Sequence, residues 1–138
     1  MQQLVFIILA LFLNHLVNAQ QQGVTIEVVI NNIENEEGQM VIGLYNSKAN
    51  WLKKVHKVTF GQIVDGKSTV AFKNVPNGIY AVSVFHDEDN DGELDTFLGI
   101  PTEDTGSSNN APARFGPPKW QDAKFELKGE SVKQIIKL

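Results

Sequence analysis

Short apolar segments, divided at close intervals by turn-forming residues, limit most strongly what this chain can fold into. In the first of them, residues 24–30, apolar and polar side chains alternate, which is the period of a strand with one buried face. Clusters of Gly, Pro, Asn and Asp separate the segments. This pattern predicts an all-β fold, a single antiparallel β-sandwich, rather than a parallel α/β fold. The seven expected strands are residues 24–30, 40–45, 58–64, 69–72, 79–86, 124–127 and 132–138.

Two local signals refine this picture. Asp65-Gly66 lies between the third and fourth expected strands and is typical of a two-residue hairpin turn, because glycine adopts a positive φ without steric cost. A helix is expected only at residues 48–55, with Ser47 as its N-cap. The side chains expected to face inward from that helix are Trp51, Leu52 and Val55.

The N-terminal region reads as a targeting segment. Residues 4–13 are an unbroken apolar run, which as a helix would be about 15 Å long, roughly half of a bilayer's hydrocarbon core. Val17-Asn18-Ala19 follows and offers the small or apolar residues that signal peptidase favours. We therefore expect a signal peptide at residues 1–19 and a single domain at residues 20–138. The alternatives are a retained membrane anchor or a buried core helix.

Composition and cleavage together narrow the location and the class of protein. The chain has no cysteine, which excludes a disulfide framework, a thiolate nucleophile and a lipid anchor at the cleavage site. Its formal net charge of −4 argues against nucleic-acid binding, which requires a basic surface. We expect an exported protein, periplasmic or secreted, with no transmembrane segment after cleavage.

Residues 87–95 carry the clearest chemical signal, the pattern D-x-D-x-D-G-x-x-D. In such a calcium loop, oxygen atoms at positions 1, 3 and 5 converge on one cation and the glycine at position 6 makes the bend. Position 7 offers its backbone carbonyl, and position 9 closes the shell directly or through water. The expected ligands are Asp87, Asp89, Asp91, Glu93 and Asp95.

Further features shape the expected site. Position 12, where a helix–loop–helix site supplies a bidentate glutamate, is Leu98, so a later carboxylate such as Glu103 or Asp104 is expected to complete the shell. Six of the sixteen acids fall within residues 87–95, without one base. Such crowded carboxylates repel one another unless a cation binds, and calcium fits better than magnesium, which demands a tight octahedral shell. The alternative is a solvated acidic turn. The whole connection, residues 87–118, is long for a segment without regular structure, which indicates a functional or anchored loop.

Other candidate groups give weaker signals. His86 next to Asp87 is either a base with its orienting acid or a strand-end residue beside the loop. Arg114, the only arginine, either pairs with a loop acid or binds an anionic ligand. Four aromatic residues either stack on a glycan or belong to the core: Trp51, Phe97, Phe115 and Trp120.

Several short segments together are similar to a known family. They are residues 85–89, 94–96, 98–103, 108–111 and 115–118, with Pro76-x-Gly78-x-Tyr80-Ala81 before the fifth strand. The mature chain resembles the domain of unknown function 2141 family of exported bacterial proteins. The resemblance implies an immunoglobulin-like or prealbumin-like sandwich, and the family has no established activity. Prealbumin-like accessory domains with the same turn mostly bind a partner or act as spacers, and they rarely catalyse a reaction.

Two functions are compatible with these features. The first is an exported, calcium-stabilised β-sandwich that acts as a binding or accessory domain, without catalytic activity. Its partner is an unidentified envelope or extracellular protein or glycan. The second is a small metal-dependent hydrolase, in which the loop ion keeps a water molecule and His86 or Glu103 acts as base.

Overall fold

The computed structural model describes residues 23–138. The apolar run at residues 4–13 and the expected cleavage site after Ala19 lie outside the described residues. Within residues 23–138, no helix is long and apolar enough to cross a membrane.

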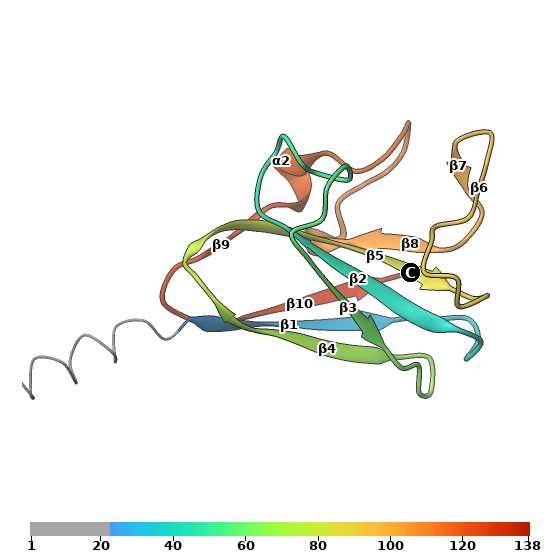
Figure 1. Ribbon diagram of the computed structural model, residues 1–138, viewed down its shortest axis with the longest axis horizontal. Helices are drawn as coiled ribbons and strands as arrows, with labels where there is room; N and C mark the ends of the chain where they lie inside the picture. The colour runs from blue at the N-terminus through green and yellow to red at the C-terminus, as the bar shows by residue number, and fades with distance from the viewer. Residues whose placement is uncertain (1–22) are drawn as a thin grey trace, which may run out of the picture.

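The lower sheet in Figure 1 contains three strands in the order β10-β1-β4. These are β1 (Val24–Asn31), β4 (Ser68–Val75) and β10 (Val132–Lys137). Strand β1 is antiparallel to β4 but parallel to β10, with Ile26 opposite Val132. The expectation of a purely antiparallel fold is therefore wrong at this pair, because the last strand returns alongside the first in the same direction.

The second sheet is antiparallel throughout and has the order β3-β2-β5-β8. Its strands are β2 (Gln39–Tyr45), β3 (Lys57–Gly61), β5 (Gly78–Asp87) and β8 (Thr105–Ser107). The start of β5 also pairs with β9 (Phe125–Leu127). All seven predicted strands are present, which confirms the all-β fold. Strand β8 and the hairpin of β6 (Thr96–Phe97) and β7 (Ile100–Pro101) lie in the connection that was expected to lack regular structure.

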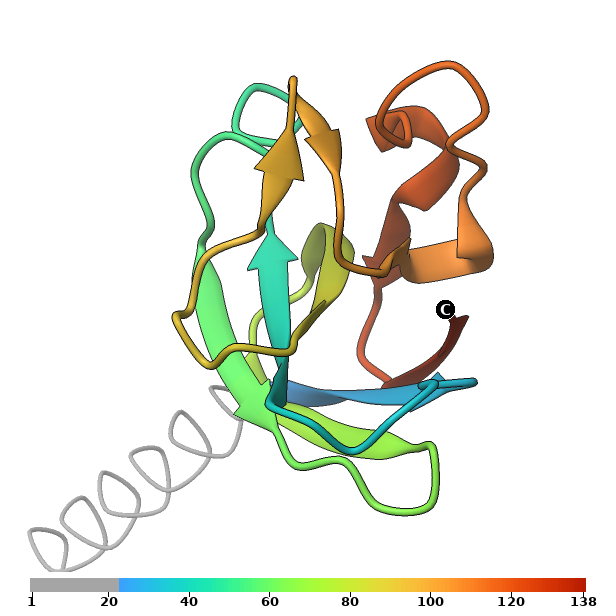
Figure 2. The same ribbon diagram turned by 90° about the vertical axis from the view of Figure 1, so that its right-hand side faces the viewer.

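Buried side chains from both sheets form the main core, and Figure 2 shows how the two sheets lie relative to each other. The alternation in β1 places Ile26, Val28 and Ile30 on its inner face, and all three are fully buried. Burial of such side chains stabilises the fold by about 1.5–3 kcal/mol each. Among residues 23–138, the buried members of this core run from Ile26 to Ile136, and all of them fall within the expected domain at residues 20–138.

The turn at Asp65-Gly66 forms as predicted, but it does not join two strands of one sheet. Both residues have positive φ, 52° and 73°, and Val64 pairs with Lys67 across the turn. On either side the chain diverges, because β3 belongs to the second sheet and β4 to the first. The third strand consequently ends at Gly61 rather than at Val64.

The predicted helix at residues 48–55 is wrong, because the segment forms consecutive turns. The carbonyl oxygen of Asn50 accepts hydrogen bonds from the N–H groups of Lys53 and Lys54, both at 2.9 Å. Leu52 has a φ of 57°, which interrupts a right-handed helix. Ser47 does accept the N–H of Asn50 through its hydroxyl oxygen, at 3.2 Å.

Tertiary packing explains the departure from helix. Trp51 is buried against Tyr45 and Trp120, whereas Leu52 and Val55, also expected inside, are exposed. The indole N–H of Trp51 donates to the carbonyl oxygen of Pro118 at 2.8 Å. Trp120 begins the short helix α2 (Trp120–Ala123), which follows the 3-10 turn η1 (Ser108–Asn110) along the chain. Trp51, Ala81, Trp120 and Ala123 form a second buried cluster.

Candidate metal centre

Asp87 anchors the acidic loop in the body of the protein. It is the last residue of β5, lies opposite Gln39 in β2, and is fully buried. Its Oδ2 atom accepts hydrogen bonds from the Gln39 side-chain amide and from the N–H of Gly92, both at 2.9 Å. Its Oδ1 atom is buried and has no hydrogen-bond partner within residues 23–138. Because most buried polar atoms in proteins have a hydrogen-bond partner, this oxygen is a candidate ligand atom.

The residues after Asp87 curl through side-chain-to-backbone hydrogen bonds. The Asp89 carboxylate accepts the N–H of Asp91 at 3.3 Å, and the Asp91 carboxylate accepts the N–H of Glu93 at 2.8 Å. Gly92, with a φ of 77°, makes the bend that the pattern predicts at position 6. As a result, carboxylate oxygens of Asp87, Asp89 and Asp91 lie within 4.8 Å of one another.

Glu103 returns to the loop and completes a second group. Oxygen atoms of Asp89, Asp95 and Glu103 also lie within 4.8 Å of one another, so the two groups share Asp89. The Glu103 carboxylate accepts the N–H of Glu88 on one oxygen and the N–H of Asp95 on the other, both at 2.9 Å. Asp104, the other candidate, is exposed and offers its carbonyl oxygen to the N–H of His86.

Five of the six predicted ligands thus bring their side chains together. The sixth, Glu93, is in neither group, and the pattern assigns it only a backbone carbonyl. An oxygen-only donor set of this kind suits a hard divalent cation.

The electrostatics of the loop differ from residue to residue. Burial raises the pKa of Asp87, but hydrogen bonds from the Gln39 amide and the Gly92 N–H outweigh it, and the net result is a lowered pKa. Asp89 shows the opposite result. Local desolvation, the adjoining Asp87 side chain and the charges of Asp91 and Asp95 raise the pKa of Asp89 to about 6. A bound divalent cation would relieve this repulsion.

Two residues that support the site were missed by the sequence analysis. Gln39 orients the Asp87 carboxylate from 48 positions away, and only the pairing of β2 with β5 brings the two together. Gly38 precedes it with a φ of 68°, and a Cβ atom there would overlap the Asp87 carbonyl oxygen and approach the Glu88 Cα to 2.7 Å. Nothing local in the sequence marks either residue as part of an acidic loop.

His86 lies beside the loop but is fully buried. Its Nε2 atom is 2.6 Å from the carbonyl oxygen of Glu37. Its Nδ1 atom has no hydrogen-bond partner within the described chain and is 3.8 Å from the Glu88 carboxylate. The imidazole is thus shielded from solvent at the end of β5.

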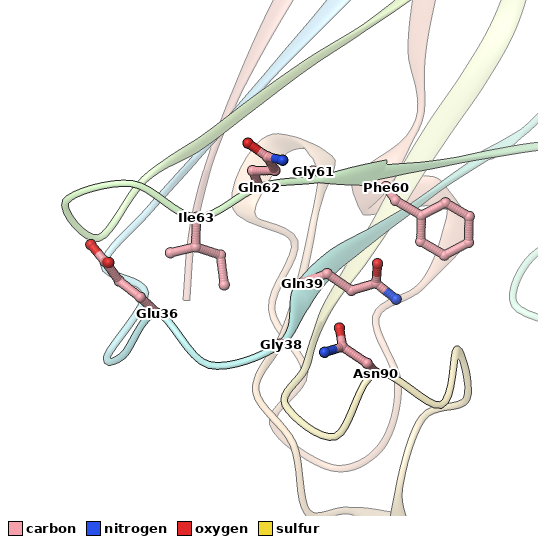
Figure 3. A pocket seen from close by; sticks show the side chains of 8 residues that line it. All are labelled: Glu36, Gly38, Gln39, Phe60, Gly61, Gln62, Ile63 and Asn90. Carbon is pink, nitrogen blue, oxygen red and sulfur yellow. The ribbon is translucent and has the colours of Figure 1, made fainter.

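A pocket of about 560 Å³ adjoins the loop (Figure 3). The amide groups of Gln39 and Asn90 lie near each other there, with the Phe60 ring at one side. Because Gln39 also holds Asp87, the pocket wall and the acidic loop share a residue. The lining consists of Glu36, Gly38, Gln39, Phe60, Gly61, Gln62, Ile63 and Asn90.

The remaining candidates are dispersed. Trp51 and Trp120 are buried in the second cluster, whereas Phe97 and Phe115 are exposed, so the four aromatic residues do not form one stacking platform. Arg114 is exposed and forms no ion pair within residues 23–138. Its predicted pairing with a loop acid is not observed.

Comparison with known families identifies the chain. Residues 28–135 match the family described as "Uncharacterized protein conserved in bacteria (DUF2141)". The chain belongs to the DUF2141 family. This confirms the resemblance noted in the sequence, and the matched range contains every predicted ligand. No curated protein and no solved structure matches the chain. Because DUF2141 is uncharacterised, the function has to be argued from the site.

Proposed function

We propose that this DUF2141 protein is an exported domain, an immunoglobulin-like or prealbumin-like β-sandwich that binds calcium in its acidic loop and serves as a binding or accessory domain. The observation that carries the proposal is the buried Asp87 carboxylate, whose Oδ1 atom has no partner while its Oδ2 atom is held by two donors. Leaving such an atom unpaired costs about 1–3 kcal/mol, a cost that a cation would offset.

The charge distribution supports calcium. The loop at residues 87–95 contributes −6, whereas the rest of the chain has ten acids and twelve bases, a balance of +2. Calcium accepts six to eight oxygen ligands in flexible geometry, and five carboxylates with one backbone carbonyl suit that demand. Magnesium needs a stricter shell and keeps several water molecules.

The arrangement favours a structural ion over a catalytic one. Both oxygens of Glu103 already accept backbone N–H groups, which makes this residue a clamp between Glu88 and Asp95. His86, the other candidate base, is buried with Nε2 close to a backbone carbonyl. A general base has to reach the proton that it abstracts. These contacts support a binding or spacing role rather than the hydrolase alternative.

Calcium should raise the melting temperature by several degrees. Because Leu98 replaces the usual bidentate glutamate, we expect a Kd of roughly 10⁻⁴–10⁻³ M. At ten times Kd, binding adds about 1.4 kcal/mol to the free energy of unfolding, which for a domain of this size corresponds to a shift of several degrees. Scanning calorimetry in chelator and in millimolar calcium measures it.

Two variants sharpen this test. Asp91→Ala should abolish the calcium-dependent rise, while Glu126→Ala, which removes an exposed acid on β9, should keep it. Identical melting curves of the unmodified protein in chelator and calcium would contradict the proposal and favour a solvated acidic turn.

Export predicts a defined mature N-terminus. If signal peptidase cleaves after Ala19, the protein recovered from its native host begins at Gln20. Intact-mass spectrometry distinguishes this product from a chain that retains Met1. Recovery of the full-length chain would contradict the assignment of a signal peptide.

A further inference from the structure

Three loops lie on the same side of the molecule, and we call this side the loop end: residues 46–56, 96–102 and 111–119. In Figures 1 and 2, which differ by a rotation about the vertical axis, all three rise on the upper side, away from the sheet β10-β1-β4. The hydrogen bond from the Trp51 indole to the Pro118 carbonyl oxygen ties the first loop to the third. The second loop is the β6–β7 hairpin with its flanking residues.

The loop end presents large apolar side chains to solvent. Phe97, Leu98 and Ile100 in the hairpin are 69%, 87% and 69% exposed, and Phe115 in the third loop is fully exposed. At the hairpin tip, Leu98 and Gly99 both have positive φ, so a tight turn holds these side chains outward. Three of the four lie together in the hairpin, and exposed apolar side chains that cluster in this way are typical of an interaction site.

The same loops are basic, in contrast to the chain as a whole. They contain five of the twelve bases and not one acid, although the chain carries a formal charge of −4. All five bases are exposed: Lys48, Lys53, Lys54, Arg114 and Lys119. The other seven bases lie elsewhere in the chain, so these loops hold nearly half of the positive charge, in residues 46–56 and 111–119, whereas the hairpin follows the acidic residues 87–95.

We infer that the loop end docks on an anionic lipid surface. The hairpin tip and Phe115 would enter the headgroup region, while the lysines and Arg114 face lipid phosphates. Apolar side chains combined with bases are the composition that binds membrane interfaces. The apolar groups stand on two separate loops, so a fluid apolar phase that adapts to both suits them better than one complementary groove.

A small pocket in the third loop fits this partner. Its volume is about 250 Å³, and Arg114, Phe115 and Lys119 line it together with Asp122 and three small or proline residues. Two bases beside an aromatic ring can receive a phosphate-containing headgroup. The pocket opens where Phe115, fully exposed, would meet the lipid.

The metal centre lies at the base of the hairpin. The N–H of Thr102 donates to the carbonyl oxygen of Asp95 at 2.9 Å, and Glu103 accepts the N–H of Asp95. A bound cation would stabilise the point where the hairpin joins the acidic loop, and it would lower the negative charge close to the lipid. The inference names a partner for the binding role proposed above, and calcium would strengthen the docking without being its source.

Vesicle co-sedimentation tests the inference, with the chain from Gln20 so that the apolar run at residues 4–13 is absent. We expect binding to vesicles of phosphatidylcholine mixed with phosphatidylglycerol, much weaker binding to phosphatidylcholine alone, and a decline with added salt. The double variant Phe97→Ser, Leu98→Ser should weaken partitioning roughly tenfold or more. Each of Lys53→Gln and Arg114→Gln should weaken it about fivefold.

Matched controls lie on the opposite sheet. Ile135, 48% exposed on β10, and Lys133 beside it face away from the loop end, so Ile135→Ser and Lys133→Gln should leave vesicle binding unchanged. Melting curves show whether every variant is folded. No binding to the anionic vesicles, or equal binding by the folded Phe97, Leu98 double variant, would overturn the inference. Self-association abolished by that double variant, without vesicle binding, would instead assign the loop end to a second copy of the chain.

Running the same experiment in calcium and in chelator separates the two proposals. Vesicle binding without any calcium effect on melting or docking would overturn the calcium site and uphold the lipid surface. A calcium-dependent melting shift without vesicle binding would overturn the lipid surface and uphold the calcium site.

Discussion

Replacing Trp51 by alanine is expected to lower the free energy of unfolding by about 3–5 kcal/mol, as for other buried large aromatic residues. Trp51 is only 8% exposed and makes edge-to-face contacts with Tyr45 and Trp120, at centroid distances of 5.0 and 6.0 Å. The substitution also removes the indole hydrogen bond to the Pro118 carbonyl oxygen. Because these contacts join residues 46–56 to residues 111–119, the substitution should loosen these two loops as well as lower the stability of the whole domain.

Urea denaturation with two comparison variants checks this prediction. Trp51→Phe keeps an aromatic ring but loses the hydrogen bond, and should cost less than Trp51→Ala. Leu52→Ala changes the next residue, which is 37% exposed, and should cost about 1 kcal/mol or less. If Leu52→Ala destabilises the protein more than Trp51→Ala does, then Leu52 rather than Trp51 is the buried side chain of this turn, and the prediction is wrong.

The strands were predictable because their signal is local. Alternation in residues 24–30 and the apolar runs in the later strands reflect which face each strand buries, and this holds whatever the partner strand is. Strand partners are a different matter. The parallel pairing of β1 with β10 joins the two ends of the described chain, and no residue near Val24 or Val132 encodes that choice.

The same distinction applies to residues 48–55. Their apolar spacing suits a helix, yet the contact of Trp51 with Trp120 and Pro118, far along the chain, replaces the helix with turns. In the candidate metal centre, Asp87 to Asp95 and Glu103 could be predicted from spacing and charge, because the loop is largely a local structure. Gln39 and Gly38 could not, because they meet Asp87 only through the sheet.

Removing calcium should make the β6–β7 hairpin about tenfold more sensitive to chymotrypsin. Within the connection, β8 pairs with β5, and Ser108 bonds to both Val82 and Ala123, so this later part is held by the body of the protein. The hairpin instead depends on the bonds of Asp95 with Thr102 and Glu103 at its base. Without a cation, repulsion among the carboxylates opens that base more often.

The sequence supplies an internal control for this experiment. Chymotrypsin, whose specificity pocket is hydrophobic, should cut after Phe97 or Leu98 in the hairpin and after Phe115 in the third loop. All three side chains are exposed, but the Phe115 loop shares no hydrogen bond with the acidic loop within residues 23–138.

When the cleavage rate follows the fraction of molecules in which the hairpin is open, calcium at ten times Kd should slow cutting at the hairpin roughly tenfold and leave the Phe115 site unchanged. Mass spectrometry of the early fragments gives both rates. Equal slowing at the two sites would mean that calcium stabilises the whole domain instead of the hairpin base, and unchanged rates at both would contradict a cation in this loop.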